Sequence, residues 1–262
     1  MFPSHDPLVK NGELYLKKEG STNAGAIVVY DSGSWRTFSN EVSAGSWNGN
    51  TYSVEFDGTN DYCLFTETVL SSGGLTFSAW VNFSNLSGGQ EPIIADDGNL
   101  SFWFFNPGNK YFYVKDASGG QSYGGPWSGT PVIDTWYHMM LIDDGNGVNN
   151  SSVKVYIDGS FVANLTTTGI SGFRFDTLGR SGGRYFPGKM DEVAIWQSDQ
   201  TSNIAAIYNS GTPGDLSSYN PLHWYRMGDN DGGTGTTITD QGSGGNNGTL
   251  TNGPIFSTSV PS

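Results

Sequence analysis

The sequence predicts an all-β protein, a sandwich of two antiparallel sheets with one short helix and a small N-terminal β segment. The prediction rests on three features of the composition. Glycine occupies 38 of the 262 positions, aromatic residues make up 14% of the chain and charged residues only 14%. Tight turns need glycine, pleated surfaces favour aromatic side chains, and helical surfaces are normally rich in lysine, glutamate and arginine. The composition therefore favours many strands joined by tight turns.

The first 47 residues contain three short strand candidates, Leu14–Lys17, Ala26–Tyr30 and Trp35–Phe38. Three such strands bury too little apolar surface to be stable alone. We therefore expect this segment either to pack on the rest of the chain or to pair with other copies of itself. The sequence predicts an attachment or oligomerisation segment over residues 1–47 and a sandwich domain over residues 48–262.

From Thr51 onward the sequence alternates between strand and turn patterns. The clearest hairpin is Val155–Val162, because Asp158-Gly159 supplies the positive φ angles that a tight turn needs. The expected strands are Tyr52–Phe56, Asp61–Phe65, Leu75–Phe83, Pro92–Ala95, Leu100–Phe105, Tyr111–Lys115, Thr135–Asp143, Val153–Ile157, Phe161–Leu165, Phe173–Leu178 and Met190–Gln197.

One helix is predicted over Ser202–Gly211, with a capping serine at its start and glycine at its end. Ile204, Ile207 and Tyr208 share one face of this helix, so it should lie on the surface of a sheet. After the helix the chain returns to strand and then to a glycine-rich turn, at Leu222–Met227, Thr236–Ile238 and 242–248.

The charge balance excludes two classes of partner. The chain has 12 basic and 25 acidic residues, a net charge of −13, and no basic cluster longer than Lys17-Lys18. Such a chain cannot release counterions along a phosphate backbone and is not attracted to anionic lipid. No apolar run approaches the roughly 20 residues that cross a bilayer. We expect neither nucleic-acid binding nor membrane insertion.

Two features bear on the compartment. Cys63 is the only cysteine, so no intrachain disulfide can form and the fold must rely on core burial. The segment Met1–Pro7 lacks the basic and apolar regions of a signal peptide. We expect synthesis in a cytoplasm without export by that route.

Four stretches, taken in order, resemble a known family: Val54–Tyr62, Phe77–Val81, Asp134–His138 with Val155–Gly159, and Gly188–Trp196. They resemble, respectively, the opening strand pair, the core strand, a hairpin and the closing strand of laminin-G-like and pentraxin-like domains. Together they resemble a concanavalin A-like jelly-roll sandwich over roughly residues 50–262.

Pro221–Asp229 and Thr239–Leu250 are also similar to this family, although in many relatives such a segment opens a domain. Here it either completes the sandwich or starts a second one. We favour completion, because too few residues remain for a second core. This tail, the N-terminal leader and the lack of a signal peptide resemble structural proteins of marine bacteriophages.

No pair of residues suggests catalysis. Retaining glycoside hydrolases place two carboxylates about 5 Å apart, and on this sandwich they alternate along one strand. Asp191 and Glu192 are adjacent, so their side chains are expected to point to opposite faces of a strand. The resemblance implies a structural role for His138, and Cys63 is expected to be a packing residue. The sequence predicts no enzyme.

Calcium is the one cofactor expected. Ca²⁺ prefers oxygen ligands, and the resemblance implies one ion at the rim of the sandwich, held by an aspartate of the closing strand and by groups near the opening strand. Asp191 is the expected ligand, with Asp57 and Asp61 supplying others. The alternative is that these aspartates accept hydrogen bonds from backbone N–H groups in turns.

Two loops carry candidate glycan-binding residues. Tyr123 and Trp127 lie in one, and Arg184 and Tyr185 in the other. Exposed aromatic rings stack on sugar faces, and planar polar groups orient sugar hydroxyls. The alternative for the aromatic residues is packing against a neighbouring subunit.

The sequence therefore predicts a non-enzymatic virion structural protein on the particle surface, as a capsid decoration, protrusion or tail-fibre component. Its lectin-like domain would serve adhesion to host-surface glycans, and its partners would be other virion proteins. Closed symmetry is expected for self-association, and the resemblance to viral fibres implies a homotrimer. The alternatives are a free carbohydrate-binding module and a cell-surface adhesin.

Overall fold

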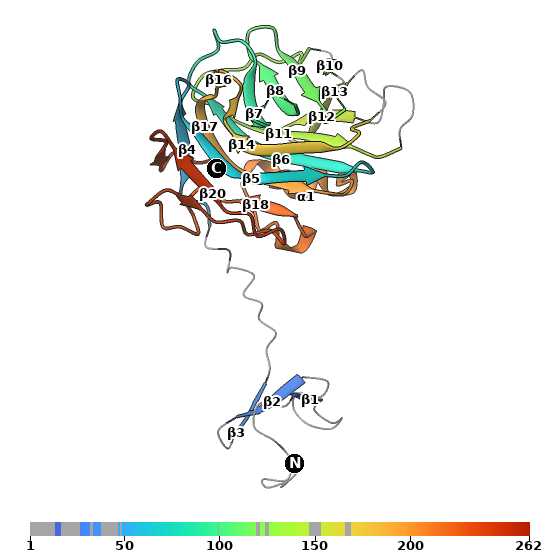
Figure 1. The fold of residues 1–262 in the computed structure, drawn as a ribbon, viewed down its shortest axis with the longest axis vertical. Helices are drawn as coiled ribbons and strands as arrows, with labels where there is room; N and C mark the ends of the chain where they lie inside the picture. Colours follow the sequence, from blue (N-terminus) through green and yellow to red (C-terminus); the bar gives the residue numbers. More distant parts are fainter. Residues whose placement is uncertain are drawn as a thin grey trace. The chain divides into compact units, whose positions relative to one another are not determined.

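The structure, a computed structural model, describes residues 14–16, 27–31, 34–37, 47, 49–98, 100–118, 121–123, 126–146, 153–165 and 169–262. It describes only the backbone of residues 14–16, 27–31, 34–37 and 121–123. The chain divides into two compact units, residues 1–46 and 47–262 (Figure 1). The boundary expected from the sequence lies one residue later. We describe each unit by itself.

The N-terminal unit contains a three-stranded antiparallel sheet in the order β1-β2-β3. Its strands are β1 (Leu14–Leu16), β2 (Ile27–Asp31) and β3 (Ser34–Thr37), within one residue of the expected bounds. The register places Tyr15 opposite Val28 and Tyr30 opposite Trp35.

The second unit, which we call the body, is a sandwich of two antiparallel sheets. Sheet I, as far as the chain is described, has eight strands in the order β10-β9-β8-β7-β14-β5-β20-β19. These strands are β5 (Tyr62–Leu70), β7 (Glu91–Ala95), β8 (Phe102–Asn106), β9 (Tyr111–Lys115), β10 (Gln121–Tyr123), β14 (Phe173–Leu178), β19 (Thr237–Ile238) and β20 (Gly248–Thr251).

Sheet II has the order β13-β12-β11-β6-β17-β4-β21, and β18 pairs with β17 beside this path. These strands are β4 (Ser53–Asp57), β6 (Leu75–Phe83), β11 (Trp136–Asp143), β12 (Val153–Ile157), β13 (Ser160–Asn164), β17 (Pro187–Trp196), β18 (His223–Tyr225) and β21 (Ile255–Ser257). A separate two-stranded hairpin joins β15 (Arg180–Ser181) and β16 (Arg184–Tyr185). The predicted two-sheet antiparallel sandwich is confirmed.

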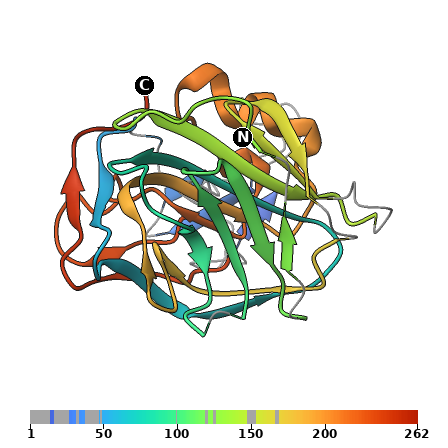
Figure 2. The same cartoon turned by 90° about the horizontal axis from the view of Figure 1, so that it is seen from above.

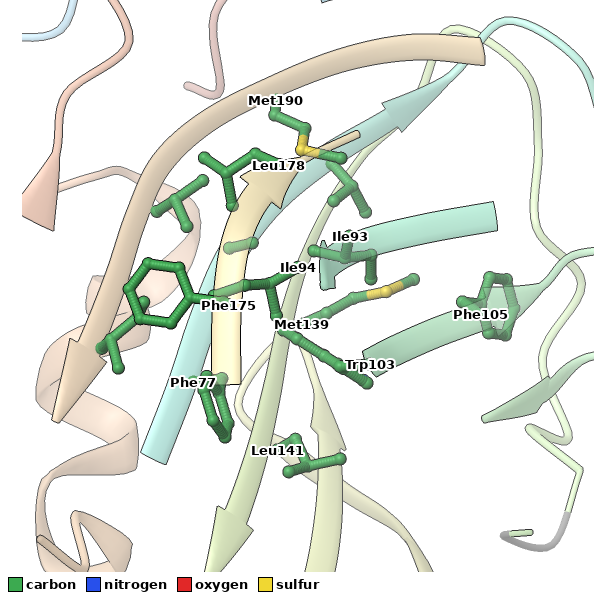
Figure 3. Packing of buried hydrophobic residues seen from close by; sticks show 14 of the residues in the cluster. Phe77, Ile93, Ile94, Trp103, Phe105, Met139, Leu141, Phe175, Leu178 and Met190 are labelled. Carbon is green, nitrogen blue, oxygen red and sulfur yellow. The ribbon is translucent and has the colours of Figure 1, made fainter. Parts of the chain in front are cut away.

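The core lies between the two sheets and is built by the alternation of side chains along each strand. On β11, Met139 and Leu141 point into this core, whereas Met140 and Ile142 belong to a separate cluster on the outer face of sheet II. The inward residues include Phe77, Met139, Leu141 and Met190 from sheet II and Ile94, Trp103, Phe105, Phe175 and Leu178 from sheet I (Figure 3). Each such side chain is fully buried and stabilises the fold by about 1.5–3 kcal/mol through removal from water.

The predicted helix is confirmed but is shorter than expected. The α-helix α1 spans Ile204–Tyr208, between the 3₁₀ turns η1 (Thr201–Asn203) and η2 (Asn209–Gly211). It ends early because Asn209 takes a left-handed conformation, with φ +48°. The buried Ile204 and Ile207 pack with Met140, Trp196 and Trp224.

This helix covers the outer face of sheet II (Figure 2). A third 3₁₀ turn, η3 (Ser217–Tyr219), follows it, and its Tyr219 packs against the same cluster. The helix and this turn therefore cover part of the outer face of sheet II. In the described part of the chain, no helix has both the length and the apolar character that crossing a membrane would need.

The C-terminal segment completes the same sandwich, as expected. β18 pairs with β17, β20 pairs with β5, and β21 pairs with β4 at the edge of sheet II. The segment therefore adds strands to both sheets. Cys63 lies on β5, fully buried in the core, where burial raises the pKa of its thiol.

Candidate functional site

The hairpin β15–β16 follows β14 and packs beside β7 of sheet I. The guanidinium carbon of Arg180 lies 4.5 Å from the ring centre of Tyr62 and 5.9 Å from that of Tyr185. Arg180 Nε also forms an ion pair of 2.9 Å with Asp97 Oδ1. Cation–π contacts of this kind are worth about 0.5–1 kcal/mol at exposed sites. They hold the hairpin in place, with Tyr185 at its end.

Beside this hairpin lies a hollow with a volume of about 480 Å³. Three chain segments that are far apart in the sequence form it: the loop between β4 and β5, the loop before β7, and the end of the hairpin with the start of β17. The lining residues are Asp57, Gly58, Thr59, Asn85, Gly88, Gly89, Gln90, Glu91, Arg184, Tyr185 and Pro187. The lining therefore combines an aromatic ring with carboxylate, amide and guanidinium groups.

The loop between β4 and β5 is held by its own aspartates. Asp57 Oδ1 accepts hydrogen bonds from the N–H groups of Thr59 at 2.7 Å and Asn60 at 3.1 Å. The bond from Thr59 is the main cause that lowers the pKa of Asp57. Asp61 Oδ2 in turn accepts a bond from the Asp57 N–H at 3.2 Å. These are the turn contacts weighed as the alternative to calcium binding, and they place an ionised carboxylate in the wall of the hollow.

Glycine is needed where this loop meets β17. Gly58 has φ +72°, and a Cβ atom there would lie 2.8 Å from Pro187 Cβ. Both the left-handed conformation and this close approach exclude a larger residue.

The structure brings together two of the four predicted glycan-binding residues, since Arg184 and Tyr185 both line the hollow. Trp127 packs instead against the core, with its ring centre 5.3 Å from that of Tyr137 and 6.3 Å from that of Phe105. The backbone of Tyr123 pairs with Tyr113 at the β10 edge of sheet I, and its side chain lies outside the described part of the chain.

A second hollow, of about 180 Å³, has a simpler lining. Its carboxylate, Asp143, accepts bonds from the N–H groups of Gly145 at 3.0 Å and Ile170 at 2.6 Å. The other lining residues are Ser72, Gly73, Gly169 and Ser171. With no aromatic ring among the lining residues, this hollow is the weaker candidate for a sugar.

A separate cluster of charged groups is buried around Arg226, at the end of sheet II. Arg226 Nε donates to Glu192 Oε1 at 3.0 Å, and its Nη2 lies 3.4 Å from Asp229 Oδ2. Asp191, Glu192 and Asp229 each place one carboxylate oxygen within 4.8 Å of the others. Arg226 is only 2% exposed, so these interactions take place away from water.

The expectation that Asp191 and Glu192 point to opposite faces of a strand is wrong. The register between β17 and β6 shifts between Asp191 and Ala194, and Glu192 has φ +45°. This β-bulge interrupts the alternation of side chains. The two carboxylates therefore converge, and Glu192 Oε2 also accepts a bond of 2.5 Å from Trp224 Nε1.

The cluster is short of positive charge. Three carboxylates face one guanidinium, which leaves an excess of two negative charges when all are ionised. Burial raises the pKa of Asp191 well above its usual value, and the charge of Glu192 adds to the effect. Burial likewise raises the pKa of Glu192 to about 7, although Arg226 acts in the opposite direction. The folded cluster therefore favours the binding of protons or of a cation.

The start of the body is bound to this cluster. Asn50 Nδ2 donates to Asp191 Oδ2 at 2.9 Å, and the Gly49 carbonyl accepts a bond from Arg226 Nη2. The Trp47 ring lies 4.2 Å from the Arg226 guanidinium carbon. Asn50 Oδ1 is shielded from solvent and has no hydrogen-bond partner among the described residues. An unpaired buried oxygen beside three carboxylates fits the oxygen ligand set that Ca²⁺ prefers.

The structure does not bring the three predicted calcium ligands together. Asp57 is opposite Pro187 in the register of β4 and β17, and Asp191 lies four residues further along β17. That separation is about 13 Å along a strand. Asp57 and Asp61 belong to the loop of the large hollow, whereas Asp191 belongs to the buried cluster.

His138 has the structural position that the sequence indicated. Its Nε2 lies 2.8 Å from Ser78 Oγ, and burial lowers its pKa to about 3. The adjoining cavity, which Glu192 also lines, has a volume of only about 10 Å³. Such a space holds about one water molecule. A sugar cannot reach either residue there.

A family model of concanavalin A-like lectins and glucanases matches residues 57–204, more than half of the chain. The chain belongs to the concanavalin A-like lectin/glucanases superfamily. The match begins at Asp57 of the hollow and ends at the start of α1, so it includes every lining residue of the hollow. No curated protein matches the chain.

The chain is also similar to solved structures. A candidate carbohydrate binding protein from Bacteroides ovatus is 24% identical, with a TM-score of 0.59 over 81% of this chain and 61% of its own. Domain 4 of an extracellular arabinanase from Geobacillus stearothermophilus, in complex with arabinotriose, is 21% identical over 53% of this chain and 68% of its own, with a TM-score of 0.39. Domains LG4-5 of the mouse laminin alpha1 chain are 12% identical over 56% of this chain and 41% of their own, with a TM-score of 0.42. The chain thus spans about three fifths of the length of the Bacteroides protein.

Sequence reasoning missed one group of the candidate hollow and one group of the buried cluster. Glu91 is followed by Pro92 and reads as a turn residue, yet it is buried in the wall of the hollow. Arg226 carried a usable signal, since a lone basic residue between Tyr225 and Met227 in an apolar strand indicates a buried ion pair.

Proposed function

We propose that the body is a carbohydrate-binding module and that the 480 Å³ hollow is its sugar site. The observation that carries the proposal is the convergence of Tyr185, Arg184, Asp57 and Glu91 on one hollow from three separate segments. An aromatic face with a few placed polar groups is the usual composition of a small-ligand site of 300–1,000 Å³. Membership of a lectin superfamily and the candidate role of the Bacteroides protein support it.

Replacing Tyr185 or Arg184 by alanine is expected to weaken sugar binding by about tenfold each, since each change removes about 1.4 kcal/mol of contact. The saccharide is first chosen on an oligosaccharide array, and the affinities are then measured by titration calorimetry. Arg174→Ala is the matched control, because Arg174 is a half-exposed arginine of β14 whose ion pair is with Glu67. Equal affinities for all three variants and the unchanged protein would place the sugar elsewhere.

We propose that the module binds without cleaving its ligand. The carboxylates that converge on β17 are buried, and the cavity beside Glu192 is too small for a sugar ring. The carboxylates that line the 480 Å³ hollow are Asp57 and Glu91. Release of reducing ends from the bound saccharide, abolished by Glu91→Gln, would show that the hollow is a hydrolase site instead.

We further propose that Asp191, Glu192, Asp229 and Asn50 hold one Ca²⁺. A divalent cation would balance the excess of two negative charges and give Asn50 Oδ1 a partner. It would tie the start of the body to β17 and to the segment after β18. Its role would therefore be structural.

Calcium at about 100 times its dissociation constant is expected to stabilise the full chain by about 2.7 kcal/mol, or roughly 5 °C in Tm. The check is a thermal melt at pH 8 in calcium and in EDTA. Asp229→Asn should lose most of the calcium shift, whereas Glu67→Gln, on the surface, should retain it. The same Tm in calcium and in EDTA would show that the negative charge of the cluster is balanced by protons and not by calcium.

We propose that the N-terminal unit attaches the module to a larger assembly, as a homotrimer on the surface of a virus particle. It forms a compact unit of its own, and its sheet of three short strands supports a role in self-association. The alternative functions for a protein with this body are a free carbohydrate-binding module and a cell-surface adhesin. Mass spectrometry of purified particles tests the virion location.

Sedimentation velocity tests the oligomer. The full chain of 28.1 kDa is expected to sediment as a trimer, and a chain that starts at Trp47 as a monomer. If both sediment as monomers, the unit does not mediate self-association.

A further inference from the structure

Glu91 is the most deeply buried charged group in the wall of the large hollow. It is the first residue of β7, it is 5% exposed, and burial raises its pKa to about 7. No salt bridge joins it to any basic group among the described residues. A carboxylate that is buried without a cation is costly to the fold. A buried carboxylate that lines a hollow can offset this cost by accepting hydrogen bonds from a ligand there.

The position of Glu91 is set by the glycines of the loop before β7. A Cβ atom on Gly88 would overlap with Glu91 Oε1, whereas a Cβ atom on Gly89 would have open space around it. Neither glycine has a positive φ angle that alanine would resist. The carboxyl group therefore lies against the backbone of a loop that itself lines the hollow.

The hollow has an excess of negative charge. Its lining contains the carboxylates of Asp57 and Glu91 and one cation, Arg184. The Arg184 guanidinium carbon lies 5.7 Å from the ring centre of Phe104. The chain as a whole carries a net charge of −13. The two carboxylates of the lining therefore oppose an anionic ligand, because like charges at close range repel.

We propose that the hollow selects neutral saccharides and that Glu91 is the residue that excludes their anionic counterparts. The inference rests on the proposed function of the hollow. Sugar hydroxyl groups are hydrogen-bond donors that a carboxylate accepts. A uronate or sulfate group at the same place would meet Glu91 and Asp57 as like charges. The two carboxylate oxygens of Glu91 thus accept hydrogen bonds from sugar hydroxyl groups and repel the anionic groups of acidic saccharides.

The test uses an array of neutral cello-, xylo-, arabino- and galacto-oligosaccharides. Each is paired with an acidic counterpart whose primary hydroxyl is oxidised to a carboxylate or, for the pentoses, with a sulfated form. The full chain is applied at pH 8, where Glu91 is mostly ionised. We expect retention of a neutral saccharide at least about tenfold above that of its acidic counterpart.

Three variants locate the selectivity. Glu91→Gln should lower this preference to less than about threefold while it still binds the neutral saccharide. Gly88→Ala, which displaces the carboxyl group, should also lower it, and Gly183→Ala, which lies outside the lining of the hollow, should leave it unchanged. Thermal melts confirm that each variant is folded.

The outcomes separate the two proposals. Retention of no saccharide by the unchanged protein would overturn the proposed function itself. Stronger retention of acidic saccharides would overturn the inference while leaving sugar binding intact. A preference that survives in folded Glu91→Gln would show that Glu91 is not the selecting residue. Loss of all saccharide binding in folded Glu91→Gln would show that Glu91 supplies affinity and would overturn its assignment as the selecting residue.

Discussion

Replacing Arg226 by methionine is expected to lower the free energy of unfolding by about 3–5 kcal/mol at pH 8, because it leaves buried carboxylates without their cation. Glu192 and Asp229 both contact the guanidinium, and so do the Trp47 ring and the Gly49 carbonyl. Urea unfolding in EDTA measures the change without a contribution from calcium. Methionine keeps much of the buried volume, so loss of packing is a small part of the effect.

The loss of unfolding free energy caused by Arg226→Met should be smaller at low pH. Burial raises the folded pKa of Glu192 from 4.5 to about 7, so this group favours the folded state most below its unfolded pKa, and that contribution is lost as pH rises through 7. Without Arg226 the pKa of Glu192 rises further, so the variant gains more stability than the unchanged protein between pH 8 and pH 5.

The matched control is Arg174→Met, whose ion pair with Glu67 is exposed and spans 3.6 Å. An exposed pair contributes about 0–1 kcal/mol. A loss of under about 1 kcal/mol for Arg226→Met, or a loss that does not depend on pH, would contradict the description of the cluster as a buried excess of negative charge.

Replacing Gly188 by alanine is expected to cost at least about 3 kcal/mol. Gly188 lies in the middle of sheet II, opposite Phe56 on one side and Phe83 on the other. It has φ +144°, and a Cβ atom there would overlap with the Asn82 carbonyl oxygen and lie 3.0 Å from its carbon. Because the obstacle is backbone, the strands β17 and β6 must separate to admit it.

Gly183→Ala is the control within the neighbouring hairpin, since no heavy atom would lie within 4 Å of its Cβ and no positive φ opposes it. It should change the free energy of unfolding by no more than about 0.5 kcal/mol. If urea unfolding gives the same midpoint for both variants, the close pairing of β17 with β6 is wrong.

Four strands have the predicted bounds to the residue: β6, β9, β12 and β14. In each, apolar or aromatic side chains stand at successive or alternate positions, which is a local pattern of the chain. β20 was missed because Leu250 is its only large apolar residue. Its strand conformation depends on pairing with β5, and Gly248 packs there against Cys63 and Phe65. Pairing between distant segments leaves no local pattern in the chain.

The candidate site, too, could be predicted from the sequence only in part. Arg184 and Tyr185 could be selected by composition, because polar and aromatic residues in a glycine-rich loop are unusual unless they bind or pack. The burial of Glu91 depends on Gly88 and on the loop around it, which no periodicity describes. The bulge at Glu192 overrides strand alternation, so the carboxylate cluster could not be derived from spacing alone.

Amide chemical-shift mapping tests sugar binding in the hollow most directly. ¹⁵N-labelled protein is titrated with the neutral saccharide retained on the array. The largest shifts are expected at Gly58, Thr59, Gly88, Gly89 and Tyr185, which come from all three segments that line the hollow. Shifts confined to the smaller hollow at Ser72, Gly73, Gly145 and Ile170, or spread without any cluster, would contradict the assignment of the sugar site.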